Sequence, residues 1–200
     1  MLISKEFKPE KNLIIAAHPD DETIGCSSIL KDSVIFLFTN PDQRRMKIFD
    51  DMCDRYNIPN VKFDLEALKL DTYGSHHLLN LLENAYIHLS KVFDIKNVFG
   101  HYSQDLHQDH QVLAKVTDIF CRRRNKNFSG YYQYFTDNSF PTENIILNES
   151  PIKVELLQRY NSGLNSKHYD YIIKFSEMLK EKYQTQYIPD AFVCKYRIGL

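Results

Sequence analysis

A continuous apolar run that ends in charged residues is the feature that most constrains the fold. Residues 13–17 are LIIAA, and residues 18–22, directly after them, are HPDDE. An unbroken apolar run of this length is typical of a strand buried on both faces of a sheet. Three consecutive carboxylates at its end cost desolvation free energy where the chain packs closely, unless a cation offsets their charge. The pattern therefore predicts a buried strand with a cation-binding group at its end.

Apolar runs alternate with helical patterns through the first two-thirds of the chain. Candidate strands cover residues 12–17, 33–39, 61–65 and 97–101, and candidate helices cover 23–31, 42–56, 76–93 and 108–124. Apolar strands divided by amphipathic helices predict a mainly parallel sheet with helices on both faces, an α/β, Rossmann-like fold. We expect residues 1–200 to form a single domain, since this length suits one core.

The last third of the chain is less regular. Residues 131–135 and 144–147 are short strands or loops, residues 168–183 fit a helix, and residues 191–198 fit a final strand. No repeat, low-complexity tract or linker interrupts the sequence, which again favours one domain.

Charge and cysteine content exclude several classes of protein. The net charge is −1, so nothing draws the chain as a whole to nucleic acid or anionic lipid. The four cysteines are scattered without a C-x-x-C pair, which is typical of reduced thiols. Residues 1–12 lack the apolar core of a signal peptide, and no window is apolar for long enough to span a bilayer. A cytoplasmic location is therefore expected.

A second polar cluster, residues 105–110 (DLHQDH), closes the apolar segment 97–101. In the common doubly wound strand order 3-2-1-4-5, the first and fourth strands are neighbours, and ligands bind beyond their carboxyl ends. Neighbouring strands lie roughly 4.8 Å apart. We therefore expect residues 18–22 and 105–110 to meet around one small ligand.

Three side chains of these clusters form a donor set for a metal ion. His18 and Asp21 are three positions apart at a strand-to-helix turn, and His110 supplies a third donor. Two imidazoles and one carboxylate suit zinc, and three protein ligands leave a position open for water, as in catalytic sites. Non-haem iron also takes two histidines and a carboxylate. The set predicts a mononuclear metallohydrolase with Zn²⁺ as the favoured cofactor.

Further residues of both clusters have roles available in hydrolysis. Asp20 is adjacent to a ligand without being needed as one, so it can accept a proton from a water activated by the metal. His107, three positions before His110, can in its protonated form stabilise a tetrahedral oxyanion and then protonate the departing amine. Asp109 or Asp105 would orient His107 through a hydrogen bond.

The chain resembles the LmbE-like, or PIG-L-like, family of zinc-dependent N-deacetylases, which act on N-acetylglucosaminyl groups and related amides. The family's first motif, A-H-P-D-D-E, is matched in full at residues 17–22, and its second, H-x-D-H, is matched at residues 107–110. The resemblance implies a Rossmann-like fold and a zinc ion held by His18, Asp21 and His110. It also implies Asp20 as the general base and His107 as the oxyanion stabiliser.

Weaker similarities concern the substrate. Arg45 resembles a family arginine implicated in substrate contact, and residues 183–186 and 190–192 resemble two late family segments. His101, at the end of the fourth predicted strand, and Asp105, at a commonly acidic family position, are further candidates for substrate contact.

One departure from the family pattern lies directly after the first motif. The family usually has paired glycines there, whereas this chain has Ser27-Ser28. Glycines allow close approach of backbone and ligand. We therefore expect the serines to narrow or re-aim the wall of the site and to affect substrate choice more than metal binding.

Together these features predict an enzyme that removes the acetyl group from an N-acetylglucosamine-type sugar or sugar conjugate, releasing acetate and a free amine. One alternative is a metal-dependent amidase that takes a non-sugar amine or a different acyl group. Another is a Rossmann-like protein that binds metal and sugar without turnover. The expected partner is a small N-acetylated sugar or sugar conjugate, not nucleic acid, and the sequence leaves open whether the chain forms a homo-oligomer.

Overall fold

A seven-stranded sheet in the order β3-β2-β1-β4-β5-β7-β6 forms the centre of the computed structural model. The structure describes residues 8–131, 133, 145–164 and 167–196, with only the backbone described for 163, 164, 167, 168 and 196. Five strands are parallel: β1 (Glu10–Ala16), β2 (Ser33–Thr39), β3 (Asn60–Leu65), β4 (Asp94–His101) and β5 (Asn127–Tyr131). Two antiparallel strands extend the sheet beyond β5: β7 (Ile188–Tyr196) and β6 (Ile145–Ser150).

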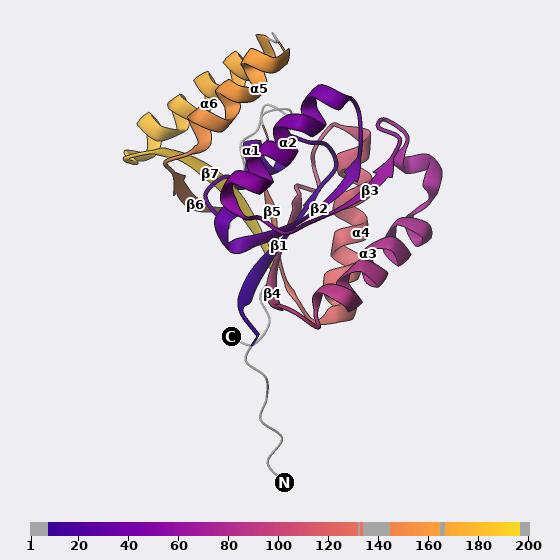
Figure 1. The fold of residues 1–200 in the computed structure, drawn as a ribbon. Helices are drawn as coiled ribbons and strands as arrows, with labels where there is room; N and C mark the ends of the chain where they lie inside the picture. The colour runs from indigo at the N-terminus through magenta and orange to yellow at the C-terminus, as the bar shows by residue number, and fades with distance from the viewer. Residues whose placement is uncertain (1–7, 132, 134–144, 165–166, 197–200) are drawn as a thin grey trace.

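Helices cover both faces of the sheet (Figure 1) because its central strands are apolar on both sides. Leu13 and Ile15 of β1 pack in a core with α3 and α4, while Ile14 and Ala16 pack in a second core with α1 and α2. Burial of alternate side chains in two cores fixes the register of β1, since a shift by one residue would exchange the faces. The helices are α1 (Asp21–Cys26), α2 (Gln43–Tyr56), α3 (Ser75–Leu89), α4 (Gln108–Arg124), α5 (Lys153–Leu164) and α6 (Lys167–Tyr183), with short 3-10 helices η1 (Leu30–Asp32) and η2 (Leu70–Tyr73).

The C-terminal helices α5 and α6 pack against each other beside the β6–β7 end of the sheet (Figure 1). A third apolar cluster joins them to α1: Ile24 from α1 contacts a group that includes Tyr160 of α5 and Tyr169 of α6. The short helix α1, which begins within residues 18–22, is therefore supported by the C-terminal part of the chain. Among the described residues, no helix combines the length and the apolar character that crossing a membrane requires.

The predicted parallel sheet with helices on both faces is confirmed, and so is the neighbouring position of β1 and β4. The predicted ranges 33–39 and 108–124 coincide with β2 and α4. Helix α1 is shorter than predicted because the chain turns away after Cys26. Strand β5 begins at Asn127, and α5 was not predicted at all. Of the uncertain segments 131–135 and 144–147, residues 132, 134, 135 and 144 lie outside the described part of the chain.

A buried polar cluster holds the end of α1 against β7. The Asp190 carboxylate accepts hydrogen bonds from the Ser27 hydroxyl at 3.0 Å, from the Ser28 backbone N–H at 2.6 Å and from the Lys153 ammonium at 2.8 Å. A buried carboxylate is tolerated only with such partners. The prediction that the serines narrow the wall of the site is wrong for Ser27, whose side chain is turned to β7.

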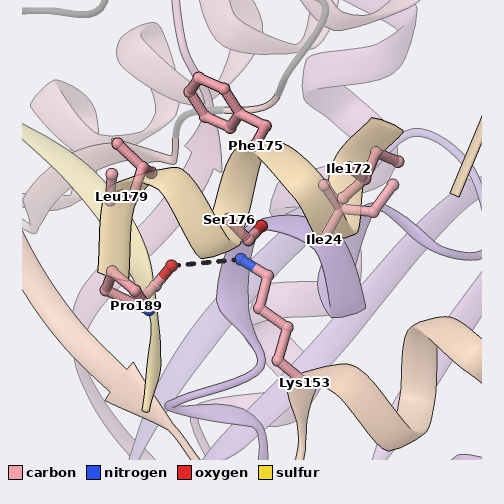
Figure 2. Close-up of a pocket in the computed structure, with 8 residues that line it drawn as sticks. Ile24, Lys153, Ile172, Phe175, Ser176, Leu179 and Pro189 are labelled. Atoms are coloured by element: carbon pink, nitrogen blue, oxygen red, sulfur yellow. Dashed lines mark hydrogen bonds between the residues drawn. The ribbon is translucent and has the colours of Figure 1, made fainter. Parts of the chain in front are cut away.

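A small cavity lies beside this cluster, between α6 and β7. Figure 2 shows Lys153 pointing into the space between Ser176 and Pro189, where its ammonium lies 3.4 Å from the Pro189 carbonyl oxygen. The cavity volume of about 10 Å³ has room for a single water molecule. The cavity is therefore too small for a ligand, and the Lys153–Asp190 pair serves the packing of α5.

Substitution of Gly25 by alanine is expected to destabilise the protein. A Cβ at this position of α1 would lie 2.8 Å from Cγ of the buried Tyr131 ring, closer than real Cβ contacts allow. Overpacking of this kind costs about 1–3 kcal/mol, whereas helix propensity alone would make Gly→Ala stabilising by about 1 kcal/mol. Thermal unfolding of Gly25→Ala is therefore expected to show a lower Tm, and an equal or higher Tm would contradict the packing described here.

Candidate metal centre

The site forms where β1 and β4 end side by side. The strands are parallel and paired, with Ile14 opposite Phe99, so their carboxyl ends lie at the same edge of the sheet. The turn after β1 carries His18 and leads into α1, which begins at Asp21. The loop after β4 leads into α4, whose first turn carries His110. The expectation that the two polar clusters meet is confirmed by direct contacts across 92 positions of sequence.

The donor atoms of the three predicted ligands converge. Nε2 of His110 lies 3.2 Å from Nδ1 of His18 and 3.4 Å from Oδ1 of Asp21, and Nδ1 of His18 lies 3.4 Å from Oδ2 of Asp21. Ligands at zinc bond lengths of about 2.0–2.1 Å occupy tetrahedron corners about 3.3–3.4 Å apart. The 3.2 Å between the two ring nitrogens therefore fits two corners of a zinc tetrahedron, and the Asp21 carboxylate lies against both rings, with one oxygen near each.

Two buried carboxylates orient the imidazoles toward this point. The Nε2–H of His18 donates to Oδ2 of Asp109 at 3.0 Å, which leaves Nδ1 of His18 facing the ligand group. The Nδ1–H of His110 donates to Oδ2 of Asp105 at 2.9 Å, which leaves its Nε2 facing the same group. Outer carboxylates of this kind fix the tautomer of metal-binding histidines.

This arrangement corrects two predicted roles. Asp109 or Asp105 was expected to orient the His107 ring, but their carboxylates bond to the His18 and His110 rings instead. Asp109 lies on the first turn of α4, where its carboxylate also accepts the Leu68 and Leu70 backbone N–H groups at 2.7 and 3.0 Å. Asp105 is fully buried, so its predicted contact with substrate is not supported either.

The electrostatics of the cluster favour protons or a cation at its centre. Burial alone would lower the pKa of His18, but its hydrogen bonds to Asp109 and Asp21 outweigh burial and raise that pKa to about 9. Burial likewise opposes protonation of His110, but attraction to Asp21 and the hydrogen bond to Asp105 raise its pKa to about 10. Burial would raise the pKa of Asp21, yet the charges of His110 and His101 hold it well below its usual range.

Asp20 lies beside the donor set in a strained backbone conformation. Its φ is 131° and its ψ is −26°, a region that L residues rarely adopt. Oδ2 of Asp20 accepts a 2.6 Å hydrogen bond from the Tyr169 hydroxyl and lies 3.4 Å from Nη1 of Arg45. Burial and the charge of Asp21 raise the pKa of Asp20 to about 6, although Arg45 and Tyr169 act in the opposite direction.

His107 lies at the start of α4, next to both metal-donor imidazoles. Its ring centroid is 4.4 Å from that of His110 and 4.8 Å from that of His18. Its Nδ1 accepts the Asp109 backbone N–H at 3.2 Å, so a neutral His107 carries its proton on Nε2. Burial and the charges of His110 and His18 lower the pKa of His107, which favours this neutral form over the protonated form that the sequence suggested.

His101, the last residue of β4, is buried behind the metal-donor side chains. It is fully buried, its Nε2 accepts the Ala17 backbone N–H at 3.0 Å, and its ring stacks on His110 at a centroid distance of 3.9 Å. Its Nε2 is also 3.5 Å from Oδ2 of Asp21. The predicted contact between His101 and substrate therefore has no basis in the structure. The His101 ring instead packs against the His110 ring and holds it in place.

Two overlapping groups of side chains at this site could each hold a metal ion. Atoms of His18, His107 and His110 lie within 4.8 Å of one another, and so do atoms of Asp21, His101 and His110. His110 belongs to both groups, whereas His18 belongs to the first and Asp21 to the second. Contacts of 3.2–3.4 Å also join His18, Asp21 and His110 to one another, through both oxygens of the Asp21 carboxylate.

An open cavity of about 550 Å³ leads to the donor group. Arg45, the predicted substrate contact, lines this cavity together with His18 and His107. Its wall has both polar and apolar side chains, which suits a ligand with hydroxyl groups and a hydrophobic face. The remaining lining residues are Asn40, Pro41, Asp42, Glu66, Ala67 and Leu68.

Several residues of the site were missed from the sequence. Gln133 donates through Nε2 to Oδ1 of Asp21 at 3.0 Å. Tyr169 bonds to Asp20, and Tyr160 donates to Oε1 of the fully buried Glu22 at 3.2 Å. Each contact spans more than one hundred residues. A local motif carries no signal for such partners.

No protein-family model matches the chain, and no curated protein matches its sequence. Solved structures do match over nearly the whole chain. The A40926 pseudoaglycone deacetylase Dbv21 is 13% identical with a TM-score of 0.69, covering 96% of this chain and 100% of that one. The zinc-inhibited form of teicoplanin deacetylase Orf2 is 12% identical with a TM-score of 0.64, covering 91% and 97%.

The chain shares its fold with these deacetylases. A further match, the conserved protein TT1542 from Thermus thermophilus, is 12% identical with a TM-score of 0.64, covering 96% of this chain and 97% of that one. Identities this low establish the fold alone, so the chemistry of the present chain depends on its own residues.

The metal-free protein is expected to lose stability as the pH rises from 6.5 to 10. The pKa values of His18 and His110 are raised to about 9 and about 10, so their contribution is complete below the ordinary value of 6.5 and is lost as the pH passes the folded values. Thermal unfolding of chelator-treated protein should therefore show a falling Tm across this range. His110→Gln should reduce the slope, His88→Gln on the exposed face of α3 should leave it unchanged, and a rising Tm would contradict the assignment.

Loss of the Asp109 carboxylate is expected to weaken zinc binding. Asp109→Asn removes the acceptor that fixes the His18 tautomer, and such outer partners are worth about 10–100-fold in metal affinity. Competition with a chromophoric chelator measures the zinc Kd, with Asp51→Asn on the exposed face of α2 as the matched control. A zinc Kd within twofold of the unsubstituted protein would show that Asp109 does not support the centre.

Proposed function

We propose that this protein is a zinc-dependent N-deacetylase of the LmbE-like type. Its substrate is an N-acetylglucosamine-type sugar or sugar conjugate, and its products are acetate and the free amine. The observation that carries the proposal is the convergence of His18, Asp21 and His110 at 3.2–3.4 Å beside the Asp20 carboxylate, at one end of an open cavity. The fold shared with the A40926 pseudoaglycone and teicoplanin deacetylases supports it.

The donor set determines which residues would hold the ion. Two imidazole nitrogens and one carboxylate form a nitrogen/oxygen set suited to zinc, with His18, Asp21 and His110 as the ligands. When bound, zinc lowers the pKa of a coordinated water and polarises a carbonyl oxygen. The protein supplies the groups that move the proton and stabilise the charge, namely Asp20 and His107.

Asp20 is the general base in this proposal. Its Oδ2 is occupied by Tyr169 and Arg45, so Oδ1 is the oxygen that takes the proton from the attacking water. The water oxygen bonds to the acetamide carbon, and the protonated Asp20 then gives its proton to the amide nitrogen. The C–N bond breaks, and acetate and the amine leave.

His107 stabilises the developing negative charge. Its Nδ1 accepts the Asp109 N–H, so the neutral ring presents an Nε2–H donor from the cavity wall. A preorganised donor at the position where an oxyanion forms lowers the barrier without a change of protonation state. The role therefore suits the neutral His107 that its surroundings favour.

The cavity wall fits a sugar. Asn40, Asp42, Arg45 and Glu66 offer hydrogen-bonding groups for hydroxyls, and Leu68 adds an apolar surface of the kind that packs against a sugar face. The structural neighbour Dbv21 is an A40926 pseudoaglycone deacetylase. A cavity of about 550 Å³ that opens to solvent can accept one sugar ring while the rest of a conjugate stays outside.

Two substitutions separate chemistry from metal binding. Asp20→Asn should lower kcat for acetate release by at least about 100-fold, because general-base catalysis contributes about 10²–10⁴-fold, while zinc content stays at one per chain. His110→Ala should lose zinc, measured by metal analysis of the purified protein. Candidate N-acetylated sugars are followed by mass spectrometry and acetate detection, with Asp54→Asn on the exposed face of α2 as the control.

Full activity in Asp20→Asn would overturn the assignment of the base. Zinc and sugar binding without acetate release from any candidate would instead identify a binding protein. Activity confined to non-sugar amides would retain the metal chemistry and reject the substrate class.

A further inference from the structure

A tyrosine from the C-terminal helix pair contacts the proposed base directly. Tyr169 of α6 is fully buried, and its hydroxyl donates to Oδ2 of Asp20 at 2.6 Å across 149 positions of sequence. The ring packs in the apolar cluster that joins α1 to α5 and α6. A hydroxyl placed this deep requires a polar partner, and the Asp20 carboxylate provides it.

Both donors at the Asp20 carboxylate approach the same oxygen. Tyr169 donates to Oδ2 from the interior, and Nη1 of Arg45 lies 3.4 Å from Oδ2 on the cavity side. Among the described residues, no donor engages Oδ1. The two oxygens therefore differ: Oδ2 is fixed by the protein, and Oδ1 remains for a proton from substrate water.

The backbone of Asp20 is held by Glu22 of α1, which itself contacts α5. Its φ of 131° is costly, and the Asp20 N–H donates to Oε2 of Glu22 at 3.0 Å. Oε1 of Glu22 in turn accepts the Tyr160 hydroxyl of α5 at 3.2 Å, and the rings of Tyr160 and Tyr169 stack at a centroid distance of 5.9 Å. Tyr169 thus contacts the Asp20 carboxylate, and Tyr160 contacts Glu22, which accepts the hydrogen bond of the Asp20 backbone.

We infer that Tyr169 is a positioning residue that fixes the Asp20 carboxylate for proton transfer, an inference that rests on the proposed deacetylase function. Asp20 is next to Asp21, and the like charges of the two carboxylates repel each other. The Tyr169 hydroxyl holds Oδ2, which leaves Oδ1 as the oxygen that would receive the proton of the reacting water. The ring provides packing, and the hydroxyl provides orientation.

The substitution Tyr169→Phe tests this role because it removes the hydroxyl and keeps the ring. We expect kcat to fall about 10-fold or more, as for other outer partners of a metal site, with KM and zinc content unchanged. Tyr171→Phe is the matched control, since it removes a hydroxyl from an exposed position of the same helix. An unchanged kcat in Tyr169→Phe, or an equal fall in both variants, would overturn the inference.

A double-mutant cycle shows whether Tyr169 acts through Asp20. In the Asp20→Asn background, Tyr169→Phe should change the residual rate less than twofold, because the group that it positions is already lost. The Tm values of the four proteins should also be non-additive. A further 10-fold loss of rate in the double variant, or additive Tm values, would show a role independent of the base.

The outcomes separate this inference from the proposed function. If Asp20→Asn retains activity, the proposed chemistry fails. If Asp20→Asn is inactive while Tyr169→Phe is fully active, the deacetylase proposal stands and only the role of Tyr169 is rejected.

Discussion

The buried carboxylates around His18 and His110 require positive charge nearby, and this requirement determines how the side chains of the site are arranged. A charged carboxylate removed from water costs several kcal/mol unless partners compensate it. Asp109 and Asp105 are compensated by the two imidazoles, and these contacts turn the other ring nitrogens toward Asp21. In the metal-free protein, protons on the imidazoles supply the charge; a divalent ion supplies it when the protons leave. The carboxylates, each at most 4% exposed, are Asp20, Asp21, Glu22, Asp105 and Asp109.

The sequence was informative where function depends on local pattern. The apolar strand β1 and the charged turn after it are contiguous, so their relation needed no tertiary information. The pairing of β1 with β4 followed from the common order of doubly wound sheets, and it brought His110 to His18. Helix α4 was bounded correctly because its apolar spacing is regular and its last turn is basic.

The remaining features depend on contacts that sequence spacing does not encode. Asp109 is two positions from His107, which suggested that one orients the other, but the first turn of α4 directs the Asp109 carboxylate to His18. Ser27 was placed on the wall of the site, yet the buried Asp190 carboxylate draws its hydroxyl to β7. Tyr169 lies on a helix that was predicted, but nothing in its neighbourhood indicates a partner 149 positions away.

A crystal structure of the zinc-loaded protein, with anomalous diffraction recorded at the zinc edge, tests the central claim most directly. We predict one peak per chain, bonded to Nδ1 of His18, Nε2 of His110 and the Asp21 carboxylate at about 2.0–2.2 Å, with a fourth position facing the cavity. A peak held by His107 in place of Asp21, or a zinc ion closed off by four protein ligands, would contradict it.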